Sequence, residues 1–191
     1  MRARPVAGPV NTVDVQSLAG PLSAGPGTDW FIDPATGAAT ASAPLRLIAP
    51  TGDFQLRALV RTSLRATFDA GTLFVHGGPD TWAKLALERS PEGADTIVTV
   101  VTRGVSDDAN GVVVPVAGQA WLRVARIGRV YAFHHSGDGA RWTLARLFTL
   151  GPVDGHRVGV GAQSPVGEGL LVTFSEIALL GSTLADVRDG S

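Results

Sequence analysis

Hydrophobic and polar residues alternate with a period of two along most of the chain. In Asp53–Thr62, for example, Phe54, Leu56 and Val60 fall on one face and Arg57 falls on the other. The same alternation is present in Trp82–Glu88, Gln119–Ile127, Arg157–Gln163 and Leu170–Ile177. Because successive side chains of a strand point to opposite faces, this pattern predicts strands with one buried face. Short strands between frequent turn signals are typical of an all-β sandwich or barrel.

Two more segments support an all-β chain. Ile97–Thr102 is apolar on both faces, which suits a central strand. Tyr131–Phe148 predicts a β-hairpin around the turn "SGDG", in which Ser136 and Asp138 would accept hydrogen bonds from backbone amides. Asp138 is therefore interpreted as part of the turn and not as a catalytic group.

Composition limits the class of protein. The 191 residues are 45% hydrophobic and contain no linker rich in proline and glycine, so we expect a single domain over residues 1–191. The net charge of -1 argues against a nucleic-acid partner, and the lack of cysteine excludes disulfides and thiolate chemistry. No run approaches the ~18–20 apolar residues that span a bilayer, and no apolar run follows the early arginines. We therefore expect a cytoplasmic protein without a membrane partner.

A series of motifs resembles a known family. It consists of "WAKLALE" (82–88), "VVTRGVSDDANG" (100–111), "WLRVAR" (121–126), "FHHSGDGARW" (133–142) and "GVGAQSPVGEG" (159–169). In this order the motifs resemble the family of uncharacterised proteins that includes the regulation of enolase protein, within the concanavalin A-like lectin/glucanase superfamily. The resemblance extends from about Asp29 to about Leu179. It implies a jelly-roll sandwich of two antiparallel sheets, and it implies little about chemistry because a fold does not determine a function.

Several side chains that point away from the predicted core combine aromatic rings with polar groups. They are Trp82, Lys84, Glu88, Trp121, Arg123 and Gln163, and Gly159 and Gly161 would leave room beside them for a ligand. In the superfamily that the chain resembles, one sheet is concave and carries the binding groove. Rings that stack on sugar C–H faces, flanked by hydrogen-bonding groups, suit saccharide recognition. We therefore expect a lectin-like module that binds a carbohydrate or another small polar ligand on its concave face. In the alternative interpretation, the tryptophans cover the ends of the sandwich and the charged side chains form ion pairs with each other.

The segment "GVSDDANG" (104–111) is predicted to be a loop at the rim of this face. Asp107, Asp108 and Asn110 would line the site, with only one of the two aspartates pointing into it, because adjacent residues of an extended segment point opposite ways. Their oxygens suit calcium, but the alternating ligands and distal glutamate of an EF-hand are missing. We expect no metal and no organic cofactor, with calcium as the alternative.

Two other functions remain open. Retaining glucanases of the superfamily carry Glu-x-Asp-x-Glu on one strand, which places two carboxyl groups ~5–5.5 Å apart, and the chain has no such triplet. Glu88 with Asp107 or Asp108 would be the catalytic candidates if the protein were a carbohydrate-active enzyme using general acid–base chemistry. A protein-interaction or regulatory module is the other alternative, and it would require a flat apolar patch in place of a groove.

Overall fold

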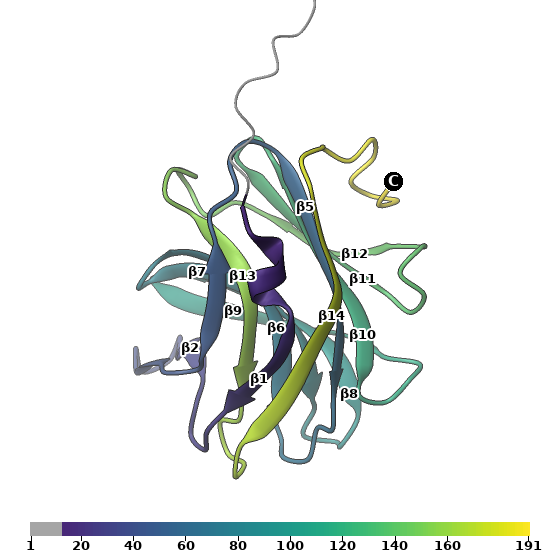
Figure 1. Cartoon of the computed structure of the whole chain (residues 1–191). Helices are drawn as coiled ribbons and strands as arrows, with labels where there is room; N and C mark the ends of the chain where they lie inside the picture. Colours follow the sequence, from purple (N-terminus) through teal and green to yellow (C-terminus); the bar gives the residue numbers. More distant parts are fainter. Residues whose placement is uncertain (1–12) are drawn as a thin grey trace, which may run out of the picture.

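The computed structural model describes residues 13–191 and shows two antiparallel sheets packed face to face (Figure 1). In spatial order, the first sheet consists of β1 (Gly20–Ala24), β14 (Leu170–Leu180), β5 (Phe54–Thr62), β10 (Gln119–Ile127), β11 (Val130–Ser136) and β12 (Thr143–Phe148). The second consists of β4 (Leu45–Ile48), β13 (Arg157–Gln163), β6 (Ala70–Gly78), β7 (Thr81–Arg89), β8 (Asp95–Arg103) and β9 (Val105–Val113). The predicted all-β sandwich of two antiparallel sheets is confirmed.

Two small elements complete the fold. The strands β2 (Trp30–Ile32) and β3 (Ala39–Ala41) form a separate hairpin. The short 3-10 helix η1 (Val15–Leu18), drawn in purple in Figure 1, contacts β14 of the first sheet and β4 of the second. No helix within residues 13–191 has the length and apolar character needed to cross a membrane.

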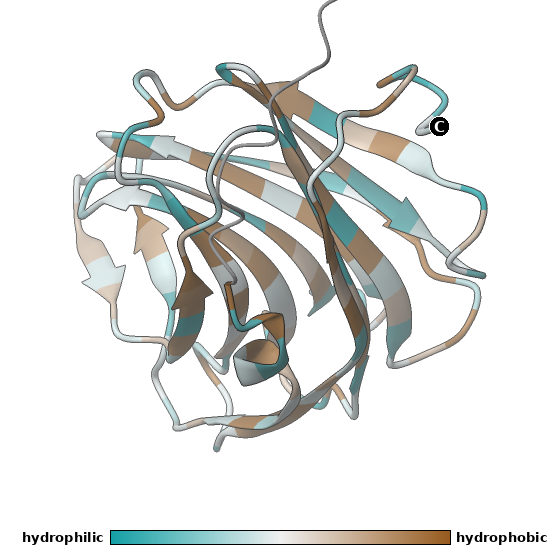
Figure 2. Cartoon of the chain, turned by 45° about the horizontal axis from the view of Figure 1, so that its top comes forward, coloured by the Kyte–Doolittle hydropathy of each residue, from teal (hydrophilic) through white to brown (hydrophobic). Residues whose placement is uncertain are grey.

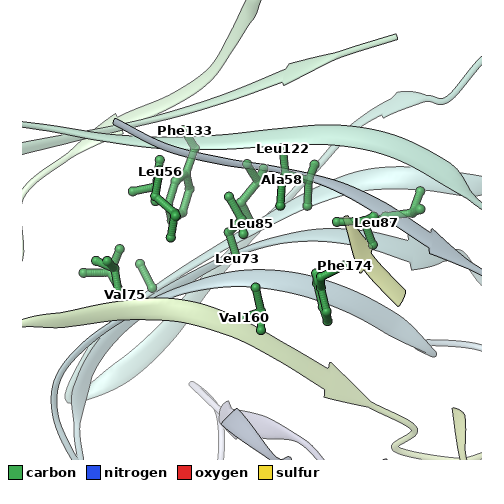
Figure 3. Packing of buried hydrophobic residues seen from close by; sticks show 14 of the residues in the cluster. Leu56, Ala58, Leu73, Val75, Leu85, Leu87, Leu122, Phe133, Val160 and Phe174 are labelled. Atoms are coloured by element: carbon green, nitrogen blue, oxygen red, sulfur yellow. The ribbon is translucent and has the colours of Figure 1, made fainter. Parts of the chain in front are cut away.

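The core lies between the sheets and consists of the inward-facing residues of both. Leu56 and Leu122 of the first sheet share one cluster with Leu73 and Leu85 of the second, and all four side chains are fully buried (Figure 3). Hydrophobic and hydrophilic bands accordingly alternate along the strands in Figure 2. Each such leucine contributes about 1.5–3 kcal/mol of transfer free energy. The predicted inward orientation is confirmed for Leu56, Leu85 and Leu122, whereas Leu73 lies on β6, a strand that was not predicted.

The outward-facing residues are divided between two separate surfaces, one on each sheet. Lys84 lies beside the core residue Leu85 on β7 and therefore belongs to the outer face of the second sheet. Trp121 and Arg123 lie on either side of the core residue Leu122 on β10 and belong to the outer face of the first. The expectation of one shared face is wrong, because alternation determines which side of a strand is buried but not which sheet the strand joins.

The segment "GVSDDANG" is not a loop. After the turn at Gly104, it forms most of β9, an edge strand that pairs only with β8. Asp108 pairs with Val100 and Asp107 pairs with Val101. The loop prediction is wrong because an edge strand that is exposed on both sides needs no hydrophobic alternation, and charged residues are common on such edges.

The two glycines that were expected to leave room for a ligand pack against the chain itself. A Cβ atom at Gly161 would lie 2.7 Å from a methyl carbon of Leu45 and 2.8 Å from the hydroxyl of Thr72. A Cβ atom at Gly159 would overlap the backbone carbonyl of Arg46. The glycines thus allow β4 to approach β13 closely, and the ligand space lies elsewhere on this sheet.

The predicted hairpin is present as β11 and β12. The Ser136 hydroxyl accepts hydrogen bonds from the backbone amides of Asp138 and Gly139, at 3.1 and 2.9 Å. The Asp138 carboxylate accepts from the amides of Ala140 and Arg141, at 2.9 and 2.8 Å. The structure therefore confirms that Asp138 builds the turn.

Candidate functional site

A cavity of about 230 Å³ opens on the outer face of the second sheet. Its polar lining consists of Asp29, Lys84, Glu88, Ser90, Asp108, Asn110 and Gln163. Its apolar lining includes Phe31 of the β2–β3 hairpin and Phe68 of the loop between β5 and β6. Among the residues predicted from the sequence, the structure brings together Lys84, Glu88, Asp108, Asn110 and Gln163.

The Lys84 ammonium is buried at the base of this cavity and has all three of its protons engaged. It donates to the Asp29 carboxylate at 2.9 Å, to the Trp30 carbonyl at 2.7 Å and to the Gln163 side-chain carbonyl at 2.8 Å. An ammonium group has three donors and no acceptor. Lys84 therefore organises the site and has no free proton for a ligand.

Glu88 is the buried acid of the cavity. The residue is 8% exposed, and none of the hydrogen bonds or ion pairs within residues 13–191 involves its carboxyl oxygens. The pKa of Glu88 is raised to about 7, mainly by burial; the charge of Lys84 opposes this rise, and the charges of Asp29 and Asp108 add to it. A carboxyl group with such a pKa exchanges its proton near neutral pH and can both donate and accept hydrogen bonds.

The two adjacent aspartates of β9 have different surroundings. Asp108 lies opposite Val100, on the outer face, and lines the cavity. Asp107 points the other way and forms an ion pair of 2.8 Å with Arg146 of β12. Asp108 is therefore the aspartate of the site, while Asp107 links the edges of the two sheets.

Phe68 is an aromatic residue of the site that sequence reasoning missed. It is 41% exposed and has a positive φ of 68°, which is uncommon for a residue other than glycine. Its carbonyl accepts a hydrogen bond of 3.1 Å from the Gln163 amide. The next residue, Asp69, is buried and accepts from the Ser164 hydroxyl at 2.7 Å. The chain thus holds Phe68 at the cavity in a strained conformation, and no periodic pattern in the sequence marks it.

A second and wider groove, of about 820 Å³, lies at the first sheet. Its charged lining residues Arg61, Arg65 and Glu168 are exposed. Arg61 is also bonded within the chain, to Gln119 at 2.9 Å and Ser175 at 3.3 Å. The smaller cavity is the better candidate because its acid is buried and its walls are fixed by hydrogen bonds.

Comparison with known proteins identifies the family. The DUF1349 family model, described as a protein of unknown function, matches residues 14–181. The chain belongs to the DUF1349 family. Regulation of enolase protein 1 of Saccharomyces cerevisiae is 33% identical over 137 residues, which make up 70% of this chain and 69% of the yeast protein. All residues of the cavity lie within the part of the chain that matches the DUF1349 model.

Solved structures support the same fold. The crystal structure of a functionally unknown protein from Saccharomyces cerevisiae has a TM-score of 0.77 and 28% identity, and the alignment covers 90% of this chain and 92% of the yeast chain. The GH43 protein BlXynB from Bacillus licheniformis has a TM-score of 0.66 at 16% identity over 85% of this chain and 32% of its own. A xylan beta-1,4-xylosidase from Bacillus halodurans has a TM-score of 0.65 at 11% identity over 94% and 41%. This DUF1349 chain therefore spans well under half of these two larger proteins, and the likeness to them concerns the fold alone.

Neither predicted stacking tryptophan serves the cavity of this DUF1349 chain. Trp82 is on the correct face but is fully buried, stacked on Phe74 at 5.4 Å and in edge contact with Trp30 at 5.8 Å. Trp121 lies on the first sheet, and a Cβ atom at Gly139 would lie 2.6 Å from its ring, so the hairpin turn covers it. Both stacking assignments are wrong.

Arg123 is also absent from the cavity of this DUF1349 chain. It lies on β10, in the first sheet, and its guanidinium stacks on Trp142 at 4.4 Å. The assignment of Arg123 to the ligand face is wrong for the same reason as that of Trp121.

Among residues 13–191, no three His, Asp or Glu side chains converge in a way that could hold a metal ion.

Proposed function

We propose that the cavity of the second sheet binds a small neutral polyhydroxylated ligand, such as one residue of a saccharide. The observation that carries this proposal is the buried, unpartnered Glu88 carboxyl beside Asp108, Asn110 and the exposed ring of Phe68. The hydroxyl groups of a sugar both donate and accept hydrogen bonds, and they match the acceptor oxygens of Asp108, the amide of Asn110 and the carboxyl group of Glu88. A C–H face of the sugar can stack on the ring of Phe68.

The size of the cavity supports a single ring. A volume of about 230 Å³ is below the range of about 300–1,000 Å³ that drug-sized ligands occupy. The ligand would therefore be one monosaccharide or the end of a longer chain that continues into solvent.

The charges of the cavity define what it excludes. Asp29 neutralises Lys84 at 2.9 Å, which leaves Glu88 and Asp108 as the remaining ionisable groups. Both are acids, so an anionic ligand would meet like charge at short range. Neutral sugars are therefore favoured over uronic acids and phosphorylated sugars.

Calorimetry with matched variants tests the proposal. Xylose, arabinose, glucose and short xylo-oligosaccharides would be titrated into the protein, together with glucuronic acid as the anionic control. Because a lost hydrogen bond to a charged group costs about 1.5–3 kcal/mol, we expect Asp108→Asn to weaken binding about tenfold or more. Asp107→Asn, one residue away and outside the cavity, is expected to leave binding unchanged. Equal effects of the two variants, or no saturable binding of any sugar, would refute the proposal.

Catalysis is the second candidate function, and the raised pKa of Glu88 favours it. A protonated carboxyl group near neutral pH can act as a general acid on a glycosidic oxygen, with Asp108 as the second carboxylate. Hydrolysis of nitrophenyl glycosides would be measured for the wild-type protein and for Glu88→Gln. If the protein is a hydrolase, Glu88→Gln is expected to lose the hydrolytic activity while still binding sugar. If the wild-type protein binds sugar but does not hydrolyse any of the glycosides, the catalytic proposal is refuted and the binding proposal stands.

A further inference from the structure

The outer face of the first sheet carries two neighbouring arginines. Arg57 of β5 and Arg123 of β10 are directly opposite each other in the antiparallel register. Arg123 is 4% exposed. Burial and, to a smaller extent, the charge of Arg57 lower the pKa of Arg123 to about 10, so Arg123 remains a cation at neutral pH.

No carboxylate neutralises this arginine pair. Every ion pair found within residues 13–191 involves other residues, and residues 1–12 contain no Asp or Glu. The Nε atoms of Arg57 and Arg123 are both buried without a hydrogen-bond partner. Burying a charge is unfavourable unless it is paired, so the chain leaves the electrostatics of this face unsatisfied.

Aromatic rings hold the two guanidinium groups in place. Arg123 lies over the ring of Trp142 at 4.4 Å, and Arg57 lies 6.0 Å from the centre of Trp121. Stacking uses the flat face of a guanidinium and leaves its N–H edge for hydrogen bonds. That edge matches the two oxygens of a carboxylate or phosphate group.

A short segment covers this face. We define the strap as residues 182–191, which follow β14 and end at the label C in Figure 1. Arg123 donates to the Gly190 carbonyl at 2.8 Å, and His134 Nε2 donates to the Val187 carbonyl at 2.8 Å. Leu184 packs against Ala125 and Ala132 of the sheet. The strap lies outside the region that matches the family model, and it contacts the arginine pair with a neutral carbonyl in place of an anion.

We propose that Arg57 and Arg123 form a binding site for a carboxylate or phosphate group, and that the strap is a displaceable lid over it. An anion would satisfy the unpartnered Nε donors and supply the missing counter-charge, which the Gly190 carbonyl does not. Opening requires the loss of a few hydrogen bonds and of the apolar contacts of Leu184 and Val187 with the sheet. The site is on the opposite sheet from the saccharide cavity and does not depend on the proposed function.

A matched pair of glycine variants tests the lid in the full-length chain. Gly190 has a φ of +77°, and a Cβ atom there would lie 2.7 Å from Trp142 and 2.8 Å from Arg123, so Gly190→Ala is expected to release the strap. Gly181→Ala is the control because a Cβ atom at Gly181 contacts nothing. Leu184→Ser provides a second way to release the strap without touching either arginine. Thermal unfolding would establish that each variant is folded, and the His134 Nε2–H resonance would report release.

Anion binding would be followed by NMR of the arginine Nε–H groups. Sodium phosphate and sodium acetate would be titrated separately, against sodium chloride at equal ionic strength, which distinguishes the two oxyanions from general salt effects. Apparent affinity falls with the fraction of molecules in the competent state, so we expect the released variants to bind at least about tenfold more tightly than the wild-type protein and Gly181→Ala. Arg123→Gln, introduced into the released variant, is expected to abolish the shifts. The site is refuted if a released, folded variant shows no saturable shift of Arg57 or Arg123, and the lid is refuted if the wild-type protein binds equally well.

Discussion

Glu88 shows how one residue can couple the stability of the protein to pH. Burial raises its pKa from 4.5 to about 7, with the charge of Lys84 opposing the rise and the charges of Asp29 and Asp108 adding to it. A raised pKa means that the folded protein holds a proton which the unfolded chain releases at lower pH. The stabilisation from this proton is complete below about pH 4.5 and is lost as the pH rises through 7.

The first prediction concerns Glu88→Gln. The amide mimics the protonated carboxyl group and does not titrate, so the variant should gain stability relative to the wild-type protein as the pH rises. Between about pH 4 and pH 8, we expect the difference in free energy of unfolding to change by roughly 3 kcal/mol in favour of the variant. Urea unfolding of both proteins at several pH values measures this difference, and comparing the two cancels the titration of the histidines. A difference that is constant with pH would contradict the assignment.

Phe68 provides a second test at the residue scale. Its positive φ of 68° favours glycine over any residue with a Cβ atom, by about 1–2 kcal/mol. We therefore expect Phe68→Gly to be about 1 kcal/mol more stable than Phe68→Ala, although both remove the same ring and glycine is normally the less stable choice in a folded segment. Thermal and urea unfolding of the two variants test the strain, and calorimetry with the sugars tests the ring, because both variants should bind less tightly. Greater stability of the alanine variant would show that the backbone is not strained at this position.

At the scale of elements, the β2–β3 hairpin is attached to the second sheet through Lys84. The lysine reaches from β7 to the carboxylate of Asp29 and the carbonyl of Trp30, immediately before and at the start of β2. The Ser106 hydroxyl of β9 accepts a hydrogen bond of 2.9 Å from the amide of Ile32, at the other end of the strand. The hairpin is thus a wall of the cavity that polar contacts keep in place, and its position depends on groups that are far away in the sequence.

Removal of the lysine is expected to release this wall. Lys84→Met removes the donor to the Asp29 carboxylate and to the side-chain carbonyl of Gln163, which should cost about 3 kcal/mol of stability because the ion pair is largely buried. Hydrogen exchange should accelerate in residues 29–43 more than in the core strands. Arg89→Met is the control, since it breaks another ion pair of β7, with Asp95, that is partly exposed and does not involve the hairpin. Uniform acceleration across both sheets would mean that Lys84 stabilises the whole fold and not the hairpin in particular.

At the scale of the whole molecule, alternation predicted an all-β sandwich or barrel, and the family resemblance pointed to the sandwich of two antiparallel sheets that the structure shows. The strands β10 and β13 coincide with the predicted segments Gln119–Ile127 and Arg157–Gln163, because each buries every second residue in the core between the sheets. The edge strand β9 was missed because most of its side chains are exposed and it carries no such pattern. Alternation of hydrophobic and polar residues identifies strands that bury one face, and it does not identify strands whose two faces are both exposed to solvent.

The candidate site could be predicted only in part, for a related reason. Lys84 and Glu88 share a strand, so their common face follows from spacing alone. Trp121 was grouped with them wrongly because sheet membership depends on long-range pairing. Asp29 and Phe68 reach the cavity from irregular segments, where no periodicity applies.

A core substitution tests whether the two sheets unfold as one unit. Leu85 of β7 is fully buried in the cluster that both sheets share, so Leu85→Ala is expected to cost about 2–5 kcal/mol. Unfolding followed by near-ultraviolet and far-ultraviolet circular dichroism should give coincident transitions. Leu171→Ala, at a position that is 57% exposed, should change the stability little. Separate transitions for the two signals would show that the sheets are not coupled through this core.

The cavity and the strap differ in whether they belong to the region that matches the family model. The family match ends at residue 181, immediately before the strap begins, whereas every residue of the cavity on the second sheet lies inside the match. A ligand found for one member of the family would therefore be informative about the cavity of the others. The face that the strap covers has to be studied in this chain itself, because the segment that closes it is not part of the shared region.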